Sequence, residues 1–370
     1  MPEEEAPSGA SSREARVFFS LALAALIGFL AFVGRGILIP VVFAGFASFL
    51  IYTLKETIKK GPIVGRFLPN WLCYLFAFAA IASILLFFAE IIRDNVEKLI
   101  AEAPLYEARL RNLTHGAIDA IEAGGLVPAD FAASVDQLRQ NALSLIQPLL
   151  GQIGGSARSI TANFVTVFLY TAFLLIERGR IFKKIALLSA DERQRRVVDE
   201  TIGDIGAMVR EYITVKSAVN LVMAIAGYLI LRLLGVDFPG FWALLLFVLN
   251  FIPIIGAVIA VAAPALLALV EPEGGARLAL LTLALLFAVE QVMSSAIEPR
   301  LVGRSLNLSP LVILFALALW GALWGFAGLL LAVPITVTIM IVMTQFQPTR
   351  PIAILMSDSG EIAPIKRPAT

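Results

Sequence analysis

The chain has 370 residues, of which 59% are apolar and 15% are charged. Soluble domains carry about 45–50% apolar and about 25% charged residues, so a soluble core of this size could not hide so much apolar surface. The composition excludes an ordinary soluble enzyme and predicts an all-α, polytopic membrane protein whose first partner is the lipid bilayer. The formal net charge of +1 makes nucleic acid an unexpected partner.

The apolar runs predict about eight transmembrane segments, because a spanning helix needs roughly 17–25 apolar residues. In chain order, the predicted spans are 17–33, 37–54, 72–92, 160–176, 212–234, 241–270, 278–297 and 308–346. Basic residues are concentrated in loops 55–69 and 177–211, and such loops favour the cytoplasm. This pattern predicts cytoplasmic N- and C-termini and an extracytoplasmic segment 93–158.

Segment 93–158 is too polar to lie in lipid, yet its apolar residues recur with helical spacing. Gly124, Gly125 and Pro128 interrupt the pattern, so we predict an antiparallel pair of amphipathic helices. The pair would lie on the membrane or against a neighbouring subunit; the alternative is a solvated extension without a partner. The predicted regions are 1–92 (three spans), 93–158 (helix pair), 159–211 (fourth span and cytoplasmic amphipathic helix), 212–346 (transport core) and 347–370 (cytoplasmic tail).

Two apolar stretches in the C-terminal half are too long for simple spans. Straight helices over 241–270 and 308–346 would measure about 45 and 58 Å, against a hydrocarbon core of about 30 Å. Both contain residues that interrupt helices, namely Asn250, Pro253 and Gly256, and Gly321, Gly325, Gly328 and Pro334. Neither stretch is therefore expected to be one straight helix; each either tilts steeply or folds back. Such paired interruptions point to the binding site of a transporter.

Three motifs in this half resemble those of a known family. They are Asn250-Phe251-Ile252-Pro253-Ile254-Ile255-Gly256, then Glu298-Pro299-Arg300-Leu301-Val302-Gly303 followed by Leu306-Asn307-Leu308-Ser309-Pro310, and Trp320-Gly321 through Trp324-Gly325, Gly328 and Val333-Pro334. Their order and spacing resemble the autoinducer-2 exporter family of permeases over about 210–345; over 1–209 only the pattern of spans does. The resemblance implies a multi-span bacterial inner-membrane protein that moves a small solute and forms a homo-oligomer.

Ionisable residues inside spans are costly, so each is a candidate functional residue. Glu290 lies in the middle of 278–297, where it serves transport or pairs with a neighbouring span. Glu298 and Arg300 flank Pro299 in a turn predicted over 298–304, where they serve transport or form a structural ion pair in an interfacial loop. Lys216 puts a further charge near a possible path in the fifth predicted span.

Other candidates for the transport path carry no charge. Asn250 either lines the path or satisfies backbone groups freed by Pro253, and Gly256 permits a close approach or an unusual backbone angle at the turn. Trp320 and Trp324 are spaced i, i+4, which suits either a path lining or helix packing.

The sequence contains no Walker A motif and no HExxH, CxxC or GxSxG motif, so we expect neither an enzyme nor a cofactor or metal site. The favoured function is a secondary transporter that exports a small solute such as autoinducer-2, driven by an ion gradient and not by ATP. One alternative is a cation/proton antiporter using Glu290 or Glu298. A second is an oligomeric membrane scaffold that transports nothing.

Overall fold

The structure is a computed structural model that describes residues 9–60, 68–123, 137, 165–177, 179–180, 184, 192–302 and 307–360. Within these ranges every named element is a helix, and the one isolated β-bridge joins Leu308 to Ser357. Five helices are long and apolar enough to cross a membrane, and shorter apolar helices accompany them. The chain is therefore an all-helical, multi-pass membrane protein, while the number of eight spans stays a prediction.

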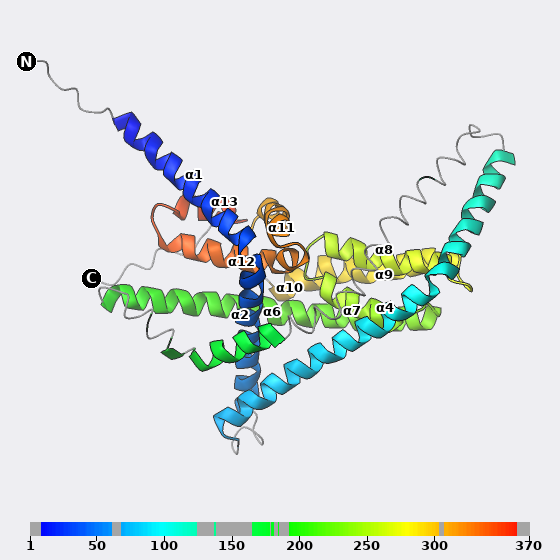
Figure 1. Cartoon of the computed structure of the whole chain (residues 1–370), viewed down its shortest axis with the longest axis horizontal. Coiled ribbons are helices and arrows are strands. Elements are labelled where there is room, and N and C mark those ends of the chain that lie inside the picture. Colours follow the sequence, from blue (N-terminus) through cyan, green and yellow to red (C-terminus); the bar gives the residue numbers. More distant parts are fainter. Residues whose placement is uncertain are drawn as a thin grey trace, which may run out of the picture.

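Helix α6 is the axis around which the C-terminal half is arranged (Figure 1). It packs against α7, α9 and α12. Helices that follow one another in the chain also pack together, namely α7 with α8, α8 with α9, and α11 with α12. The bounds are α6 (Glu192–Leu234), α7 (Pro239–Leu249), α8 (Ile255–Val270), α9 (Ala276–Val292), η1 (Met293–Ile297), α10 (Glu298–Val302), α11 (Pro310–Trp324), α12 (Phe326–Gln345) and α13 (Arg350–Met356). The largest buried apolar cluster contains side chains from α6, α7, α8, α9 and α11.

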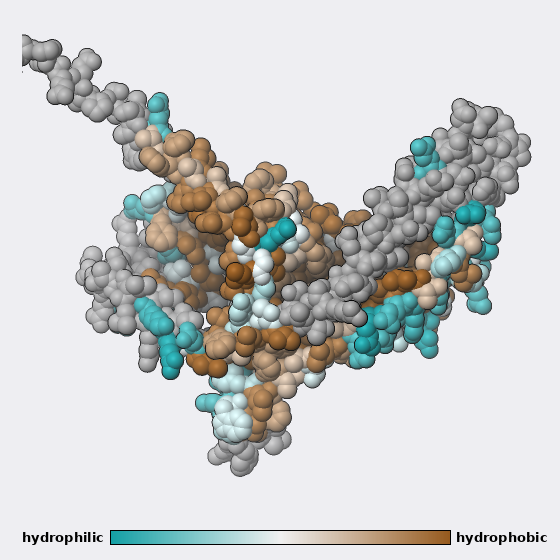
Figure 2. Space-filling model, in the orientation of Figure 1, coloured by the Kyte–Doolittle hydropathy of each residue, from teal (hydrophilic) through white to brown (hydrophobic). Residues whose placement is uncertain are grey.

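The two N-terminal helices, α1 (Gly9–Val33) and α2 (Arg35–Lys60), meet end to end at Gly34 and do not fold back along each other (Figure 1). Helical hydrogen bonds continue through the junction, from the Gly34 amide to the Leu30 carbonyl and from the Leu38 amide to the Gly34 carbonyl. Gly34 is therefore a kink in a helical path. Apolar side chains such as Phe18 and Phe29 are exposed on α1, as expected of a lipid-facing helix (Figure 2).

Helix α4 is continuous from Asn70 to Ala123 and corrects our prediction that the third span and the first amphipathic helix are separate elements. Residues 70–103 contain neither Gly nor Pro, so the sequence offers no stop where the apolar part ends and the amphipathic part begins. Helix α6 likewise joins the predicted amphipathic segment before residue 212 to the fifth predicted span. The second helix of the predicted pair, near residue 130, lies outside the described residues.

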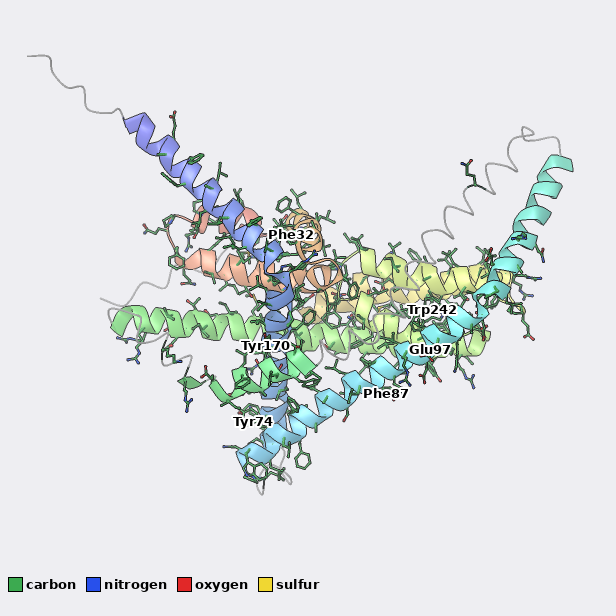
Figure 3. All side chains as sticks on the ribbon, viewed as in Figure 1. Phe32, Tyr74, Phe87, Glu97, Tyr170 and Trp242 are labelled. Atoms are coloured by element: carbon green, nitrogen blue, oxygen red, sulfur yellow. The ribbon has the colours of Figure 1, made fainter. Side chains whose placement is uncertain are left out.

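Lys55 joins α2 to α4 near the start of α4. Its ammonium lies over the rings of Tyr52 and Tyr74, at 5.5 and 5.2 Å from their centroids, and 2.7 Å from the Glu56 carboxylate. Figure 3 shows Tyr74 at this junction. Ring faces attract cations more strongly once water is excluded, so this contact stabilises the pair of helices.

Both long apolar stretches are broken, which confirms that neither is one straight helix. Helix α7 ends at Leu249 and α8 begins at Ile255, while α11 ends at Trp324 and α12 begins at Phe326. Each hairpin closes over a glycine: a methyl group on Gly256 would overlap the Leu249 carbonyl, and one on Gly328 would overlap the Trp320 carbonyl. The hairpins therefore depend on the missing side chain at these two positions.

The far part of α4 is held to the helical core by a polar cluster. The Tyr106 hydroxyl lies 2.8 Å from Glu102 Oε2 and 3.2 Å from Asp237 Oδ2, in the loop between α6 and α7. The Asp237 amide in turn donates to Glu271 Oε1 at 2.8 Å, just after α8. Burial raises the pKa of Glu271 to about 7, because water is removed from the carboxylate.

The glycine contacts lead to a prediction about stability. We expect Gly256→Ala and Gly328→Ala each to lower the thermal midpoint of the purified protein by several degrees, because the hairpin must open to admit a methyl group. The control is Gly240→Ala on α7, where open space surrounds the added carbon. Midpoints for the first two variants equal to that of Gly240→Ala would contradict this account of the hairpins.

The raised pKa of Glu271 leads to a prediction about pH. The folded state favours the protonated carboxyl, so its contribution to stability is fully present below about pH 4.5 and is lost as pH rises through about 7. The two pKa values limit the effect to about 3 kcal/mol. Glu271→Gln should therefore flatten the fall in thermal midpoint between pH 5 and 8. Glu273→Gln, at an exposed carboxylate of the same loop, should leave the fall unchanged.

Candidate functional site

A polar stripe lies on the buried face of α6. Tyr212, Lys216, Asn220 and Met223 follow one another at steps of four, four and three, so they share one side of the helix. All four are buried, and Asn220 is fully enclosed. Its side-chain amide donates to the carbonyl of Phe247 on α7 at 3.0 Å. The stripe thus faces the neighbouring helices and not lipid.

The strongest contact of the stripe is an ion pair with α10. Lys216 Nζ lies 2.6 Å from Glu298 Oε1, and the two side chains are 8% and 27% exposed. Removing one partner of such a pair leaves an uncompensated charge where little water can reach it, which costs about 3–5 kcal/mol. The pair therefore ties the middle of α6 to the first residue of α10.

Glu290 lies beside this ion pair, near the end of α9. Its side chain is buried, and Asn250, at the end of α7, donates to its Oε2 across 3.3 Å. The same Asn250 nitrogen lies 2.7 Å from the Met223 sulfur. Lys216 and Glu298 are both close enough to act electrostatically on Glu290. One lysine and two carboxylates therefore form a single electrostatic unit.

A short π-helix lies between the two carboxylates. Eight residues of regular α-helix would turn Glu298 about 80° away from Glu290. Residues Met293–Ile297 instead form η1, whose wider i→i+5 turns reduce the rotation. Both carboxylates consequently reach the polar stripe of α6. Such π-segments are frequent at functional sites, because they re-aim side chains at the expense of regular packing.

The structure brings together only part of the predicted site. Glu290 and Asn250 are joined by a hydrogen bond in which the Asn250 amide donates, while Glu298 lies further along the same helix and pairs with Lys216. Pro253 and Gly256 lie in the adjoining turn of the α7–α8 hairpin. Arg300 is exposed, and the ion-pair partner of Glu298 is Lys216, so the structure favours neither of the two roles predicted for Arg300.

The turn predicted over 298–304 is also corrected. Residues Glu298–Val302 form helix α10, which continues α9 and η1 without a break. Pro299 therefore stands inside a continuous helix and removes one of its backbone hydrogen bonds, directly after the wider turns of η1. Residues 303–306 lie outside the described part of the chain. The helix accounts for the position of Glu298, because its first turn follows directly from η1.

The two tryptophans pack within the α11–α12 hairpin and against α1. Trp320 Nε1 donates to Thr336 Oγ1 at 3.2 Å, and Trp324 Nε1 donates to the Ala31 carbonyl at 3.0 Å. Figure 3 shows Phe32, the neighbour of Ala31, where α1 reaches α11. Their rings lie 5.2 Å apart. These contacts are what helix packing requires.

An open apolar hollow of about 480 Å³ lies against the α11–α12 hairpin, where the start of α8 borders it. Its wall comes from the start of α8, from α11 and from the start of α12, with Ile255, Leu317, Gly321 and Phe326 among the lining residues. Trp320 and Trp324 do not line it. Ile255 directly precedes Gly256, so the hollow adjoins the turn that follows Asn250.

Sequence reasoning missed the way α6 completes the site. Lys216 was noticed as a charge in a span, but its partner is 82 residues away, and no spacing rule reveals such a pair. Asn220 and Met223 carried no signal of their own. The helical spacing of Tyr212, Lys216 and Asn220 was the one available clue, because polar residues at i, i+4 and i+8 in an apolar span share a face.

The structure combines long apolar helices with two helical hairpins and a cluster of ionisable side chains on α6, α9 and α10. These features are typical of a multi-pass membrane protein of the transporter class. Comparison with known proteins agrees: residues 19–347 match the model of the family described as AI-2E family transporter. The chain belongs to the AI-2E family of transporters. Its relatives are named as transport proteins and not as enzymes.

Two curated relatives illustrate the range of similarity. The AI-2 transport protein TqsA of Escherichia coli (strain K12) is 34% identical over 230 residues, which are 61% of this chain and 64% of that protein. A protein of Haemophilus influenzae (strain ATCC 51907 / DSM 11121 / KW20 / Rd), named provisionally as a transport protein, is 26% identical over 303 residues. That match covers 79% of this chain and 83% of the relative.

Proposed function

We propose that this chain is a secondary transporter that exports a small solute such as autoinducer-2, driven by an ion gradient and not by ATP. Membership of the AI-2E family and the name of the E. coli relative support the solute. The sequence has no Walker A motif, which supports a gradient as the energy source. The matched segment spans 64% of that relative, so its substrate is carried over here as a proposal.

The observation that carries the proposal is Glu290 beside the Lys216–Glu298 pair. Lys216 and Glu298 cancel each other's charge, so the net charge of the cluster follows the protonation of Glu290 alone. A protonated Glu290 leaves the cluster neutral, and an ionised one leaves it at −1. A carrier coupled to protons needs such a two-state group, because moving a buried net charge through a low-dielectric region is costly.

The two hairpins supply a route for the solute. The open apolar hollow against the α11–α12 hairpin is within the size range of small-molecule sites, and Ile255 links it to the turn that follows Asn250. In this proposal the solute occupies the hollow while Glu290 gains or loses its proton. The α7–α8 hairpin then links the two events, since Asn250 ends α7 and Ile255 begins α8.

The alternative is a cation/proton antiporter, and the two carboxylates favour it. In that case Glu290 and Glu298 would exchange a proton for a metal cation, and no organic solute would move. Reconstituted vesicles separate the two functions, because antiport acidifies or alkalinises the lumen when a sodium gradient alone is imposed. Solute export requires the solute itself on one side.

We further propose the bacterial cytoplasmic membrane as the location, with both termini and loop 55–69 in the cytoplasm and 93–158 outside. The basic loops support this orientation. Because α1 and α2 form one helical path bent at Gly34, the side of the membrane on which each segment lies has to be measured. In a Cys73→Ser background, Ser134→Cys should react with an impermeant thiol reagent added outside intact cells; labelling from the inside alone would reverse the topology.

The proposed homo-oligomer is checked by the mass of the purified protein in detergent.

Glu290→Gln provides the test of the proposed function. The amide keeps the size and hydrogen-bonding ability of the carboxyl but cannot change charge, so we expect the variant to assemble and to lose at least about tenfold in proton-gradient-driven flux of autoinducer-2 in proteoliposomes. Its flux should also stop varying with pH. Glu273→Gln, at an exposed site, is the matched control. Unchanged, pH-dependent flux in correctly assembled Glu290→Gln would refute the role of this carboxyl.

A further inference from the structure

The Lys216 ammonium stands where a metal cation would be expected. It is 2.6 Å from one oxygen of Glu298 and acts electrostatically on Glu290, and little of the side chain is exposed. The titratable groups facing it come from every packed helix that carries one: Tyr212 on α6, Glu290 on α9 and Glu298 on α10. Helices α7 and α8 add no ionisable side chain.

The surrounding oxygen atoms are of the kind that binds hard cations. Carboxylate and side-chain amide oxygens are their usual ligands, and Glu298 and Glu290 provide the carboxylates. Asn220, one turn from Lys216, adds an amide oxygen that is fully buried and has no hydrogen-bond partner within the described part of the chain. A buried acceptor without a donor is uncommon, because its desolvation is not compensated.

We propose that the Lys216 ammonium is a built-in counter-cation that fills a latent metal-cation site formed by Glu298, Glu290 and Asn220. The chain then needs no free sodium at this place. Any consequence for transport rests on the proposed function, whereas the occupancy of the site does not. Substituting Lys216 by a neutral residue should open the site and make the protein sodium-dependent.

Glutamine is the suitable replacement for this lysine. Lys216→Gln keeps a polar side chain of intermediate length, contributes another oxygen, and leaves Glu298 as an unpaired, partly buried carboxylate. A sodium ion that enters restores the charge balance and is therefore bound by the folded state alone. Binding to the folded state raises the thermal midpoint in proportion to the logarithm of ligand concentration.

The first measurement is thermal unfolding of the purified full chain in lipid nanodiscs, at constant ionic strength, as choline chloride is replaced by NaCl up to 150 mM. We expect Lys216→Gln to gain about 2–5 °C. Wild type and Lys216→Arg should change by less than about 1 °C. The double variant Lys216→Gln with Glu298→Gln should lose the response, because no unpaired charge remains.

A matched control comes from the other buried lysine. Lys55 pairs with Glu56 at 2.7 Å, and its side chain is 11% exposed, close to the values of the Lys216 pair. Lys55→Gln also leaves a carboxylate without its lysine. Within the described residues, however, Glu56 is the one carboxylate that acts on Lys55, and no unpartnered amide oxygen lies on the same turn of its helix. Its midpoint should not respond to sodium, so a response there equal to that of Lys216→Gln would overturn the proposal.

If Lys216→Gln does not fold, thermal unfolding of the wild-type protein in sodium still tests the proposal. Saturable stabilisation of the wild type by sodium, abolished by Glu298→Gln, would show that a free cation already binds and would overturn the proposal. The flux arm is separate: replacing sodium by choline should leave wild-type autoinducer-2 flux unchanged. Absence of all flux under any gradient would refute the proposed function, and the unfolding data would still decide whether the site is latent.

Discussion

The arrangement of the C-terminal half depends on one buried ion pair, between Lys216 and Glu298. Neither charge is tolerated alone among apolar helices, so α6 and α10 must meet at these two residues. This requirement determines where the chain leaves α9, and η1 supplies the change of register that the meeting needs. Glu290 is then brought against the pair, and a structural contact becomes part of a site with a titratable charge.

Small residues allow the rest of the half to close around that pair. Gly256 and Gly328 each let a helix begin against the carbonyl group of the preceding helix, so the two hairpins turn within five residues and one residue. Close approach of this kind replaces the hydrophobic driving force that helices lack when lipid surrounds them. The apolar hollow lies against the α11–α12 hairpin, so its shape depends on how tightly that hairpin turns.

Much of this fold was predictable from local pattern, and the site was predictable only in part. Hydropathy and the interrupting residues correctly predicted long apolar helices and the breaks near Pro253 and Gly325. The prediction failed where a helix continues past its apolar part without a stop signal, as α4 does, and where the helix of α9 and η1 continues through Pro299 instead of ending in a turn. Charge in a span identified Glu290, but the pairing of Lys216 with Glu298 depends on tertiary packing across 82 residues, which no local period encodes.

Helix α7 connects this site to the polar cluster that holds α4. It begins at Pro239, two residues after Asp237, and ends at Leu249, next to Asn250, so its 11 residues separate the two polar clusters by about 16 Å. At one end the Asp237 amide bonds to Glu271, and at the other the Asn250 side chain bonds to Glu290. The Asn220 side chain also donates to the Phe247 carbonyl of α7, so this helix is tied to α6 between its two ends. Because one short helix carries all three contacts, the position of Asn250 beside Glu290 and the contact of Tyr106 with Asp237 depend on the same element.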